Sequence, residues 1–393
     1  MIRVLATGIL LVILVLPQAA RAAPSPLVRA VRAQAEVAYQ GEQIVMTWLG
    51  STVDVALVKI QHDPASQTQL AYTPLGSSRR LNVLFQDETE IRYDPTRQRG
   101  TRTARVAFGD QLDEVFLETH LPLLQANYRI SVSPGRFLGR NVEIVVLSPI
   151  SRDRPTRRMA IDQETGVILR SERIRQDGRL VQATVFLSFQ VMPRGWLKEM
   201  RPPANIYLRE IPPPRWVTLE EAAKRLGDKP VPIVPPEGFK PIAYYLTSGR
   251  EPVLQEVYID GLSVLLVTYR RGTLPHPPRG SHIVRGKTGP IWALPMGLRN
   301  LVHWSYRGWL ITMVGEVTME SLVRSAERTG VAPSPRVWDR ILSWFRDLRG
   351  FLRSHLEESG QAYMILTAWR FASPSQPRPH STYPRTLGEN PQN

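Results

Sequence analysis

The stretch from Asn127 to Val191 constrains the fold of this chain more than any other. It alternates apolar runs with short turn sequences, among them Glu164-Thr165-Gly166 and Gln176-Asp177-Gly178. Glycine tolerates the positive φ angles that tight hairpins need. Connections this short join antiparallel strands, because a parallel crossover needs about a dozen residues or more. The stretch therefore predicts a series of antiparallel hairpins.

Residues 1–22 have the pattern of a secretory signal peptide. Arg3 precedes an apolar run over residues 4–16, and Ala20-Arg21-Ala22 forms a small-residue cleavage site. An uncleaved membrane anchor is the alternative, but the apolar run is shorter than the roughly 20 residues needed to cross a bilayer. We expect a mature chain that begins at Ala23 and works in the periplasm or another extracytoplasmic space.

Length and composition predict two domains. The chain has 393 residues, of which 42% are hydrophobic and 22% charged, enough for two separate cores. The formal net charge is +15, and there is no cysteine. The absence of cysteine excludes thiol catalysis, disulfides, cysteine metal sites and a lipid anchor on an N-terminal cysteine.

The first domain is predicted over residues 23–192 and has an α+β composition. Period-two apolar patterns predict strands at 37–49, 53–61, 69–72, 81–86 and 88–93, after a short helix at 26–36. Helical spacing predicts one further helix at 109–125. Many short strands with few helices favour a curved antiparallel sheet, a half-barrel that holds a helix in its concave face.

Apolar residues on these strands are candidates for the lining of a hydrophobic cavity. The candidates are Met46, Trp48, Phe85, Ile144, Val146 and Phe186. Methionine and tryptophan together make an adaptable lining that suits acyl chains. An ordinary filled core explains the same residues equally simply. The cavity hypothesis predicts that a charged residue at position 48 or 85 abolishes acyl-chain binding.

Residues 193–236 are rich in proline and predict a semi-rigid linker. Within the linker, Thr218-Leu219-Glu220-Glu221 is a capping box that begins a short helix. A smaller α+β domain is predicted over 237–330, with a hairpin turn at Asp260-Gly261.

Motifs in the second domain resemble the MucB/RseB family, regulators of an envelope-stress sigma factor. They are Pro236-Glu237-Gly238-Phe239, the segment from Val257 to Leu262, and Val314-Gly315-Glu316-Val317. Ile259 stands where the family usually has serine. With Gly139-Arg140 and the two hairpin turns upstream, the resemblance covers about residues 37–330 in the same order.

The resemblance implies a non-enzymatic sensor-regulator with an N-terminal domain similar to the lipoprotein carriers LolA and LolB. Such proteins bind the extracytoplasmic domain of an anti-sigma factor, and lipid-like or lipopolysaccharide molecules are thought to release it. Lipid or lipoprotein acyl chains are a further expected partner. A lipoprotein or lipid carrier of the LolA type is the alternative function. No cofactor is implied, and secretion argues against a nucleic-acid partner.

Two arginine-rich loops are candidates for contact with an acidic partner or with lipid headgroups. The candidates are Arg97 and Arg99 in one loop and Arg154 and Arg157 in the other. Guanidinium groups bind carboxylate and phosphate in bidentate fashion. A solvated arginine-rich surface is the simpler alternative. No histidine pair has metal-site spacing, and no nucleophile elbow or phosphate-binding loop occurs.

The last residues extend beyond the resemblance. Residues 331–372 predict an amphipathic helical extension, which could contact a membrane surface or cover an edge of the second domain. Residues 373–393 are rich in proline, serine and threonine and are predicted to be disordered.

Overall fold

The structure is a computed structural model of the chain. It describes residues 25–49, 52–76, 80–86, 89–104, 114–213, 215–228, 230–247, 251–273, 277–278, 280–287 and 289–330, without the side chains of 114–119. The predicted signal peptide, helical extension and disordered tail lie outside these residues and stay predictions.

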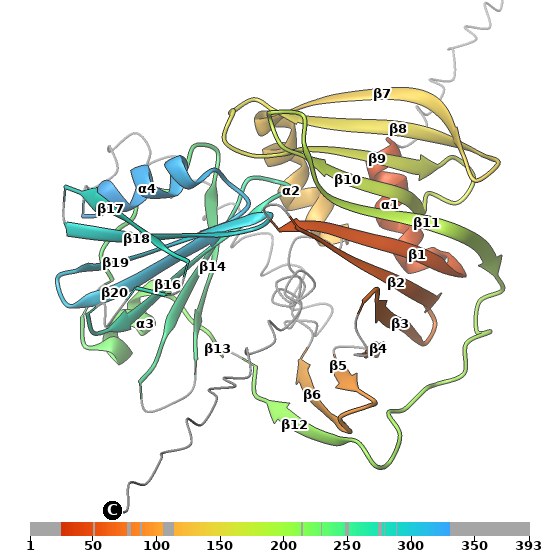
Figure 1. Cartoon of the computed structure of the whole chain (residues 1–393), viewed down its shortest axis with the longest axis horizontal. Coiled ribbons are helices and arrows are strands. Elements are labelled where there is room, and N and C mark those ends of the chain that lie inside the picture. The colour runs from red at the N-terminus through yellow and green to blue at the C-terminus, as the bar shows by residue number, and fades with distance from the viewer. Residues whose placement is uncertain are drawn as a thin grey trace, which may run out of the picture.

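Most of the described chain belongs to two sheets, with few helices. Figure 1 shows the larger sheet curving from β7 at the top to β12 at the bottom, beside the smaller sheet. The larger sheet has the order β12-β6-β5-β4-β3-β2-β1-β11-β10-β9-β8-β7. Its strands are β1 (Ala38–Leu49), β2 (Thr52–Asp63), β3 (Gln67–Pro74), β4 (Leu81–Gln86), β5 (Thr89–Asp94), β6 (Arg99–Ala104), β7 (Tyr128–Phe137), β8 (Arg140–Pro149), β9 (Thr156–Asp162), β10 (Ile168–Ile174), β11 (Leu180–Met192) and β12 (Tyr207–Ile211).

The predicted hairpins are confirmed. From β7 to β11, each strand pairs antiparallel with the next one along the chain. β11 then returns to pair with β1, so the hairpin series joins the first strands of the domain. Short turns leave no room for any other order.

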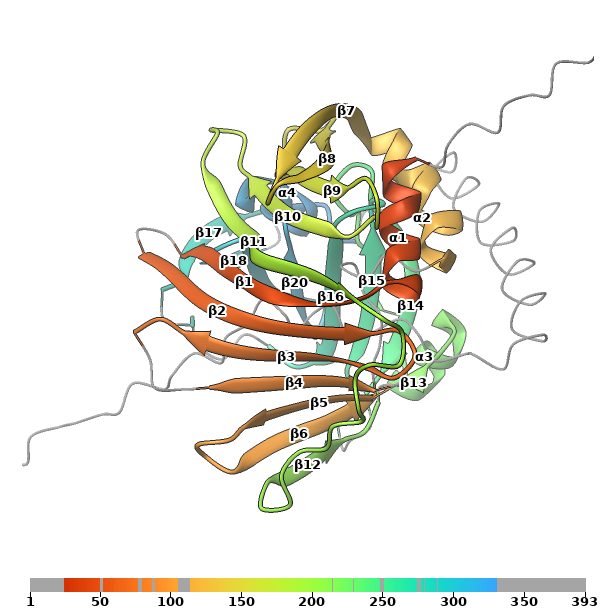
Figure 2. The same cartoon turned by 90° about the vertical axis from the view of Figure 1, so that its right-hand side faces the viewer.

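Two helices, α1 (Pro26–Glu36) and α2 (Glu114–Asn127), accompany this sheet and lie beside one another (Figure 2). Ser25 caps α1, because its hydroxyl accepts a hydrogen bond from the backbone N–H of Val28 at 3.3 Å. Leu27 of α1 and Leu124 of α2 belong to the same buried cluster as Val145 of β8. Both helices therefore pack on one face of the sheet, while the predicted position of a helix in a concave face stays a prediction.

Part of the predicted linker joins the first sheet. β12 pairs with β6 in parallel, with Tyr207 opposite Arg99 and Ile211 opposite Thr103. Leu208 packs with the buried Leu84 of β4. A proline-rich segment can pair at the edge of a sheet, where missing N–H groups face solvent. The sequence between β12 and the first strand of the second sheet is only Pro212 to Pro214.

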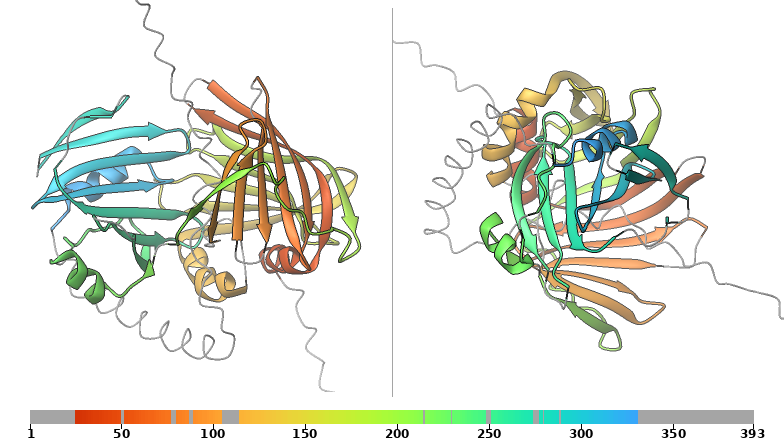
Figure 3. Two further views of the ribbon diagram at one scale, coloured as in Figure 1. Left: turned by 90° about the horizontal axis from the view of Figure 1, so that it is seen from below. Right: turned by 90° about the vertical axis from the view of Figure 1, so that its left-hand side faces the viewer.

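The second sheet has the order β13-β14-β15-β16-β20-β19-β18-β17. Its strands are β13 (Arg215–Trp216), β14 (Lys240–Leu246), β15 (Leu254–Ile259), β16 (Val264–Arg271), β17 (His282–Gly286), β18 (Gly289–Met296), β19 (Arg299–Tyr306) and β20 (Trp309–Gly315). The helices α3 (Leu219–Leu226) and α4 (Met319–Glu327) accompany this sheet, as the two views of Figure 3 show. The predicted capping box is confirmed, since Thr218 and Glu221 exchange hydrogen bonds at the start of α3.

Neighbouring residues of β11 provide a test of the core. Phe186 is 2% exposed and its ring lies 6.0 Å from that of Tyr39, whereas Leu187 is 50% exposed. We expect Phe186→Ala to lower the free energy of unfolding by about 3–5 kcal/mol, because it leaves a cavity. Leu187→Ala should change it by less than about 0.5 kcal/mol. Urea denaturation measures both, and equal effects would contradict this assignment of faces.

Candidate functional site

The predicted cavity residues do not lie on one face of the sheet. Phe85 and Phe186 belong to one buried cluster together with Tyr39 of β1. Met46 and Trp48 alternate with Tyr39 along β1, whose pairing with β2 has no irregularity. Side chains alternate between the two faces of a strand, so Met46 and Trp48 point to the opposite face. The prediction that these four residues line one cavity is therefore wrong.

Ile144 packs against the buried cluster that contains Phe85 and Phe186, whereas Val146 lies on the face of Met46. Val146 pairs with Arg158 of β9, and the register continues across the sheet to Met46. Ile144 and Val146 are partly exposed, whereas the intervening Val145 is buried against the helices. Residues 144–147 of β8 are all apolar, so no alternation of polar and apolar residues could show which of these side chains face the helices.

The four predicted contact arginines are separated as well. Arg97 and Arg99 are exposed at the hairpin between β5 and β6, towards one end of the larger sheet. Arg154 lies in the loop between β8 and β9, and Arg157 lies in β9, towards the other end of the sheet. Arg154 is 3% exposed and therefore cannot contact a headgroup or an acidic partner on the surface. The prediction for Arg154 is wrong, because its charge is used inside the protein.

Arg154 forms the centre of a joint between the two domains, which we call the domain joint. Its Nη1 donates to Asp260 Oδ2 at 2.5 Å, and both side chains are almost fully buried. Tyr128 Oη donates to the same oxygen at 2.7 Å. The other carboxylate oxygen accepts backbone N–H groups of Leu262 and Ser263 at 2.8 and 2.6 Å. A buried ion pair is stable only when its remaining polar atoms are paired in this way.

The guanidinium of Arg154 is itself fully engaged. Nε donates to Asp153 Oδ1 at 2.8 Å, Nη2 donates to the carbonyl of Glu237, and the group lies 4.8 Å from the ring centre of Phe239. Burial alone would lower the pKa of Arg154, but attraction to Asp260 and Asp153 outweighs it and the net shift is upward. The guanidinium therefore stays charged at any physiological pH.

Backbone contacts close the domain joint around this pair. Asn127 Nδ2 donates to the carbonyls of Gly238 and Asp260 at 3.2 and 2.9 Å. Gly261 has a φ of +100°, and a Cβ atom placed there would lie 2.3 Å from the backbone nitrogen of Leu124 in α2. Only glycine allows the second domain to approach the helix this closely.

A second ionic contact lies apart from the joint. The carboxylate of Glu316 lies 3.4 Å from the guanidinium of Arg173 in the first domain. It also lies 4.0 Å from the guanidinium of Arg299 in its own domain. The turn at Gly297 also touches Leu49 at the end of β1, since an added Cβ would lie 2.5 Å from that side chain. The domains thus meet over several elements, which fixes their relative orientation.

The second domain contains a half-buried carboxyl that the sequence did not indicate. Glu256 on β15 accepts hydrogen bonds from the hydroxyls of Tyr244, Tyr258 and Tyr269, the last at 2.9 Å. Removal from water raises the pKa of Glu256, and the three donors offset this only in part. The hydroxyl donors come from three adjacent strands, so the cluster ties β14, β15 and β16 together.

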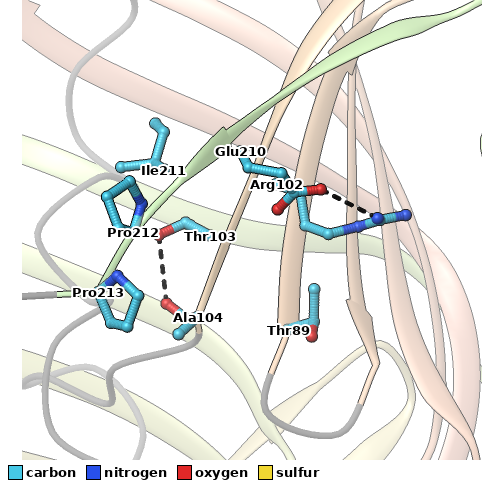
Figure 4. A pocket seen from close by; sticks show the side chains of 8 residues that line it. All are labelled: Thr89, Arg102, Thr103, Ala104, Glu210, Ile211, Pro212 and Pro213. Carbon is cyan, nitrogen blue, oxygen red and sulfur yellow. Dashed lines mark hydrogen bonds and ion pairs between the residues drawn. The ribbon is translucent and has the colours of Figure 1, made fainter.

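A cavity of about 410 Å³ lies where β12 joins the first sheet (Figure 4). Its lining residues are Thr89, Arg102, Thr103, Ala104, Glu210, Ile211, Pro212 and Pro213. Arg102 and Glu210 form an ion pair at 3.0 Å, so the two charges of this lining neutralise each other. The cavity therefore offers a ligand no unpaired charge from these residues.

Some kinds of site are absent from the part of the chain that the structure describes. Within it, no group of three or more histidine, aspartate or glutamate residues could hold a metal ion. No helix in the same ranges is long and apolar enough to cross a membrane. The functional residues that sequence reasoning missed are those of the joint. Asp260 fits a hairpin turn, and only its burial shows that it is an ion-pair partner.

Comparisons with known proteins relate this architecture to a family. Residues 24–213 match the model described as the MucB/RseB N-terminal domain. The complex structure of Pseudomonas aeruginosa MucA/MucB resembles the fold with a TM-score of 0.50 and 16% identity, over 77% of this chain and 95% of that chain. A crystal structure of MucB in complex with MucA(peri) gives 0.49 and 16%, over 77% and 96%.

A LolA superfamily protein from Nitrosomonas europaea also matches. It has 10% identity and a TM-score of 0.18, over 73% of this chain and 89% of that chain. No curated protein matches the sequence. At 16% identity, the likeness to the structure of the MucA/MucB complex shows a shared fold and nothing more.

The domain joint predicts a large and specific effect of Asp260. Asp260→Ala leaves the charge of Arg154 buried without its partner, which should lower the free energy of unfolding by about 3–5 kcal/mol. Asp177→Ala removes an exposed ion pair with Arg179 at 3.7 Å and should cost less than about 1 kcal/mol. Urea denaturation compares the two, and small-angle X-ray scattering detects separated domains. Equal and small effects would show that the joint does not hold the domains.

Glu256 predicts a pH dependence of stability. Because its folded-state pKa is raised, its contribution is fully present below the unfolded pKa of about 4.3 and is lost as pH rises through the folded pKa. We expect wild type to lose stability relative to Glu256→Gln as pH rises above the unfolded pKa, until Glu256 is ionised in the folded state as well. The exposed Glu251→Gln serves as control. Parallel stability curves for wild type and Glu256→Gln would contradict the assignment.

Proposed function

We propose that this chain, which belongs to the MucB/RseB family through its N-terminal domain, is an extracytoplasmic regulator of a sigma factor. It would bind the extracytoplasmic domain of a membrane-spanning anti-sigma factor and thereby tune an envelope-stress response. The observation that carries the proposal is the family match over residues 24–213. A fold shared over 95% of the MucB chain in its structure with MucA supports it.

The docked domains would present one continuous surface to the partner. The domain joint and the contact between Arg173 and Glu316 hold the two sheets together. Only Pro212 to Pro214 separate β12 on one sheet from β13 on the other. We infer that a partner meets both domains at once, and that movement of one domain against the other requires the joint to open.

Electrostatic attraction would bring an acidic partner to this surface. The chain carries a formal net charge of +15, and Arg97 and Arg99 remain exposed. An extended acidic segment could add to a free sheet edge, where backbone hydrogen bonds supply affinity. Long-range attraction between exposed charges is screened at physiological salt, where the Debye length is about 8 Å. Association should therefore weaken as salt concentration rises.

The proposal includes release of the anti-sigma factor by a lipid-like ligand. Phe85 and Phe186 are buried with Ala33 of α1 in one cluster, so an acyl chain could reach this face only by displacing the helix. Such a ligand would regulate the partner only if it bound the open and closed arrangements with different affinity. A lipoprotein or lipid carrier similar to LolA would use the same face, and that function is the alternative.

Capture of the anti-sigma ectodomain tests the proposal. We expect residues 23–393 to retain the extracytoplasmic segment of an anti-sigma factor encoded beside this chain, at low salt and less at high salt. Arg97→Glu combined with Arg99→Glu should weaken retention, because charge complementarity steers association. Arg179→Glu, a reversal at a residue with an 80% exposed side chain, is the matched control. Lipid added to the complex should reduce retention.

The opposite result distinguishes the two functions. No retention at low salt, combined with lipid that co-purifies with the native protein in mass spectrometry, would replace the regulator with the carrier. Retention that no lipid changes would keep the regulator and remove the lipid from the proposal.

A further inference from the structure

Strand β7 forms one end of the larger sheet and pairs, among the described residues, only with β8. Residues 129–134 of β7 are all exposed, so neither face of this part of the strand is covered. Ile130 and Val132 are 38% and 49% exposed although both are apolar. Figure 1 shows β7 along the upper rim of the sheet. A long edge strand of this kind is a template for a further strand.

The register shows which backbone groups face outward. β7 and β8 join through a two-residue turn with positive φ at Leu138 and Gly139, which makes Phe137 and Arg140 a hydrogen-bonded pair. The backbone N–H of Ile150 donates to the carbonyl of Asn127 at 2.9 Å. The N–H and C=O groups of the odd-numbered residues of β7 therefore point towards β8 along the whole strand. The N–H and C=O groups of the even-numbered residues therefore point away from the sheet.

The outward residues combine apolar side chains with free backbone groups. Ile130 and Val132 pair with Leu147 and Val145, which are buried under α1 and α2. The side chains of all four share one face of the sheet. A strand added to β7 would extend this apolar layer by one row while its backbone paired with the N–H and C=O groups of Ile130 and Val132.

The other sheet ends offer shorter strands for pairing. β6 is already covered by β12, and the ends of the second sheet are β13 with 2 residues and β17 with 5. β7 has 10 residues. We propose that the outer edge of β7 binds an extended acidic segment of the partner as an additional strand. The inference deepens the proposed function and rests on it for the identity of the natural partner.

Charge selects the occupant of this edge. Arg129 and Arg136 are exposed near the two ends of the outward stretch, and no ion pair involves either within the described residues. A segment with alternating apolar residues and a carboxylate near each end matches both features. A second copy of the chain would instead bring like charges together.

Proline substitution and hydrogen exchange test the proposal on residues 23–393. The amide protons of Ile130 and Val132 should exchange freely in the protein alone and become protected when the anti-sigma ectodomain binds. Those of Ser131 and Ser133, which face β8, should be protected in both states. Val132→Pro removes one outward N–H and keeps the pairing with β8, as Pro134 already does, so it should weaken binding about tenfold. A synthetic peptide of alternating valine and threonine with a glutamate at each end should bind saturably to wild type only.

Ile283→Pro is the matched control. Ile283 faces outward on β17, the free edge of the second sheet, and its substitution should leave binding unchanged. Binding of the ectodomain without protection at β7, or unchanged binding by Val132→Pro, would overturn the inference and leave the proposed function standing. If the ectodomain does not bind, the proposed function fails, and the synthetic peptide alone decides whether β7 accepts a strand. Protection in the free chain that disappears on dilution or on removal of residues 331–393 would assign the edge to a second copy or to the tail.

Discussion

The buried ion pair between Arg154 and Asp260 is the interaction on which the arrangement of this molecule depends. Neither charge could stay away from water without its partner, and each is completed by further hydrogen bonds from both domains. The pair therefore exists only when the two sheets are docked. Its specificity is geometric, because Gly261 must meet the backbone of α2 for the carboxylate to reach the guanidinium.

This arrangement changes how the two domains can cooperate. A flexible tether would allow independent movement, whereas the observed joint, with its short proline connection, favours a rigid body. Any signal that separates the domains must compensate for a buried charge, so separation would be close to all-or-none. The β7 edge lies at the end of the same sheet whose β8–β9 loop carries Arg154. Tyr128, the first residue of β7, donates to Asp260, so a strand added at that edge would lie beside a strand that contributes to the joint.

Local patterns in the sequence predicted the elements that local chemistry decides. The hairpin series after Asn127, the capping box at Thr218 and the order of both domains follow from turn residues and apolar period. The faces on which the candidate cavity residues lie could not be predicted, because β1 and β8 carry apolar residues on both faces. A shift of one residue along a strand moves every side chain to the other face of the sheet. Arg154 could not be distinguished from its exposed neighbours, since the partner carboxylate lies 106 residues away.

The parallel pairing of β12 with β6 has a consequence for how the protein is made. The strand that completes the larger sheet lies about a hundred residues further along the chain than the strand it covers, so the outer edge of β6 stays open until β12 has been made. A fragment that stopped at Met192 would keep that edge permanently, and open edges promote aggregation. The family match extends to residue 213, just past the end of β12. Expression of the first domain alone should therefore include this strand.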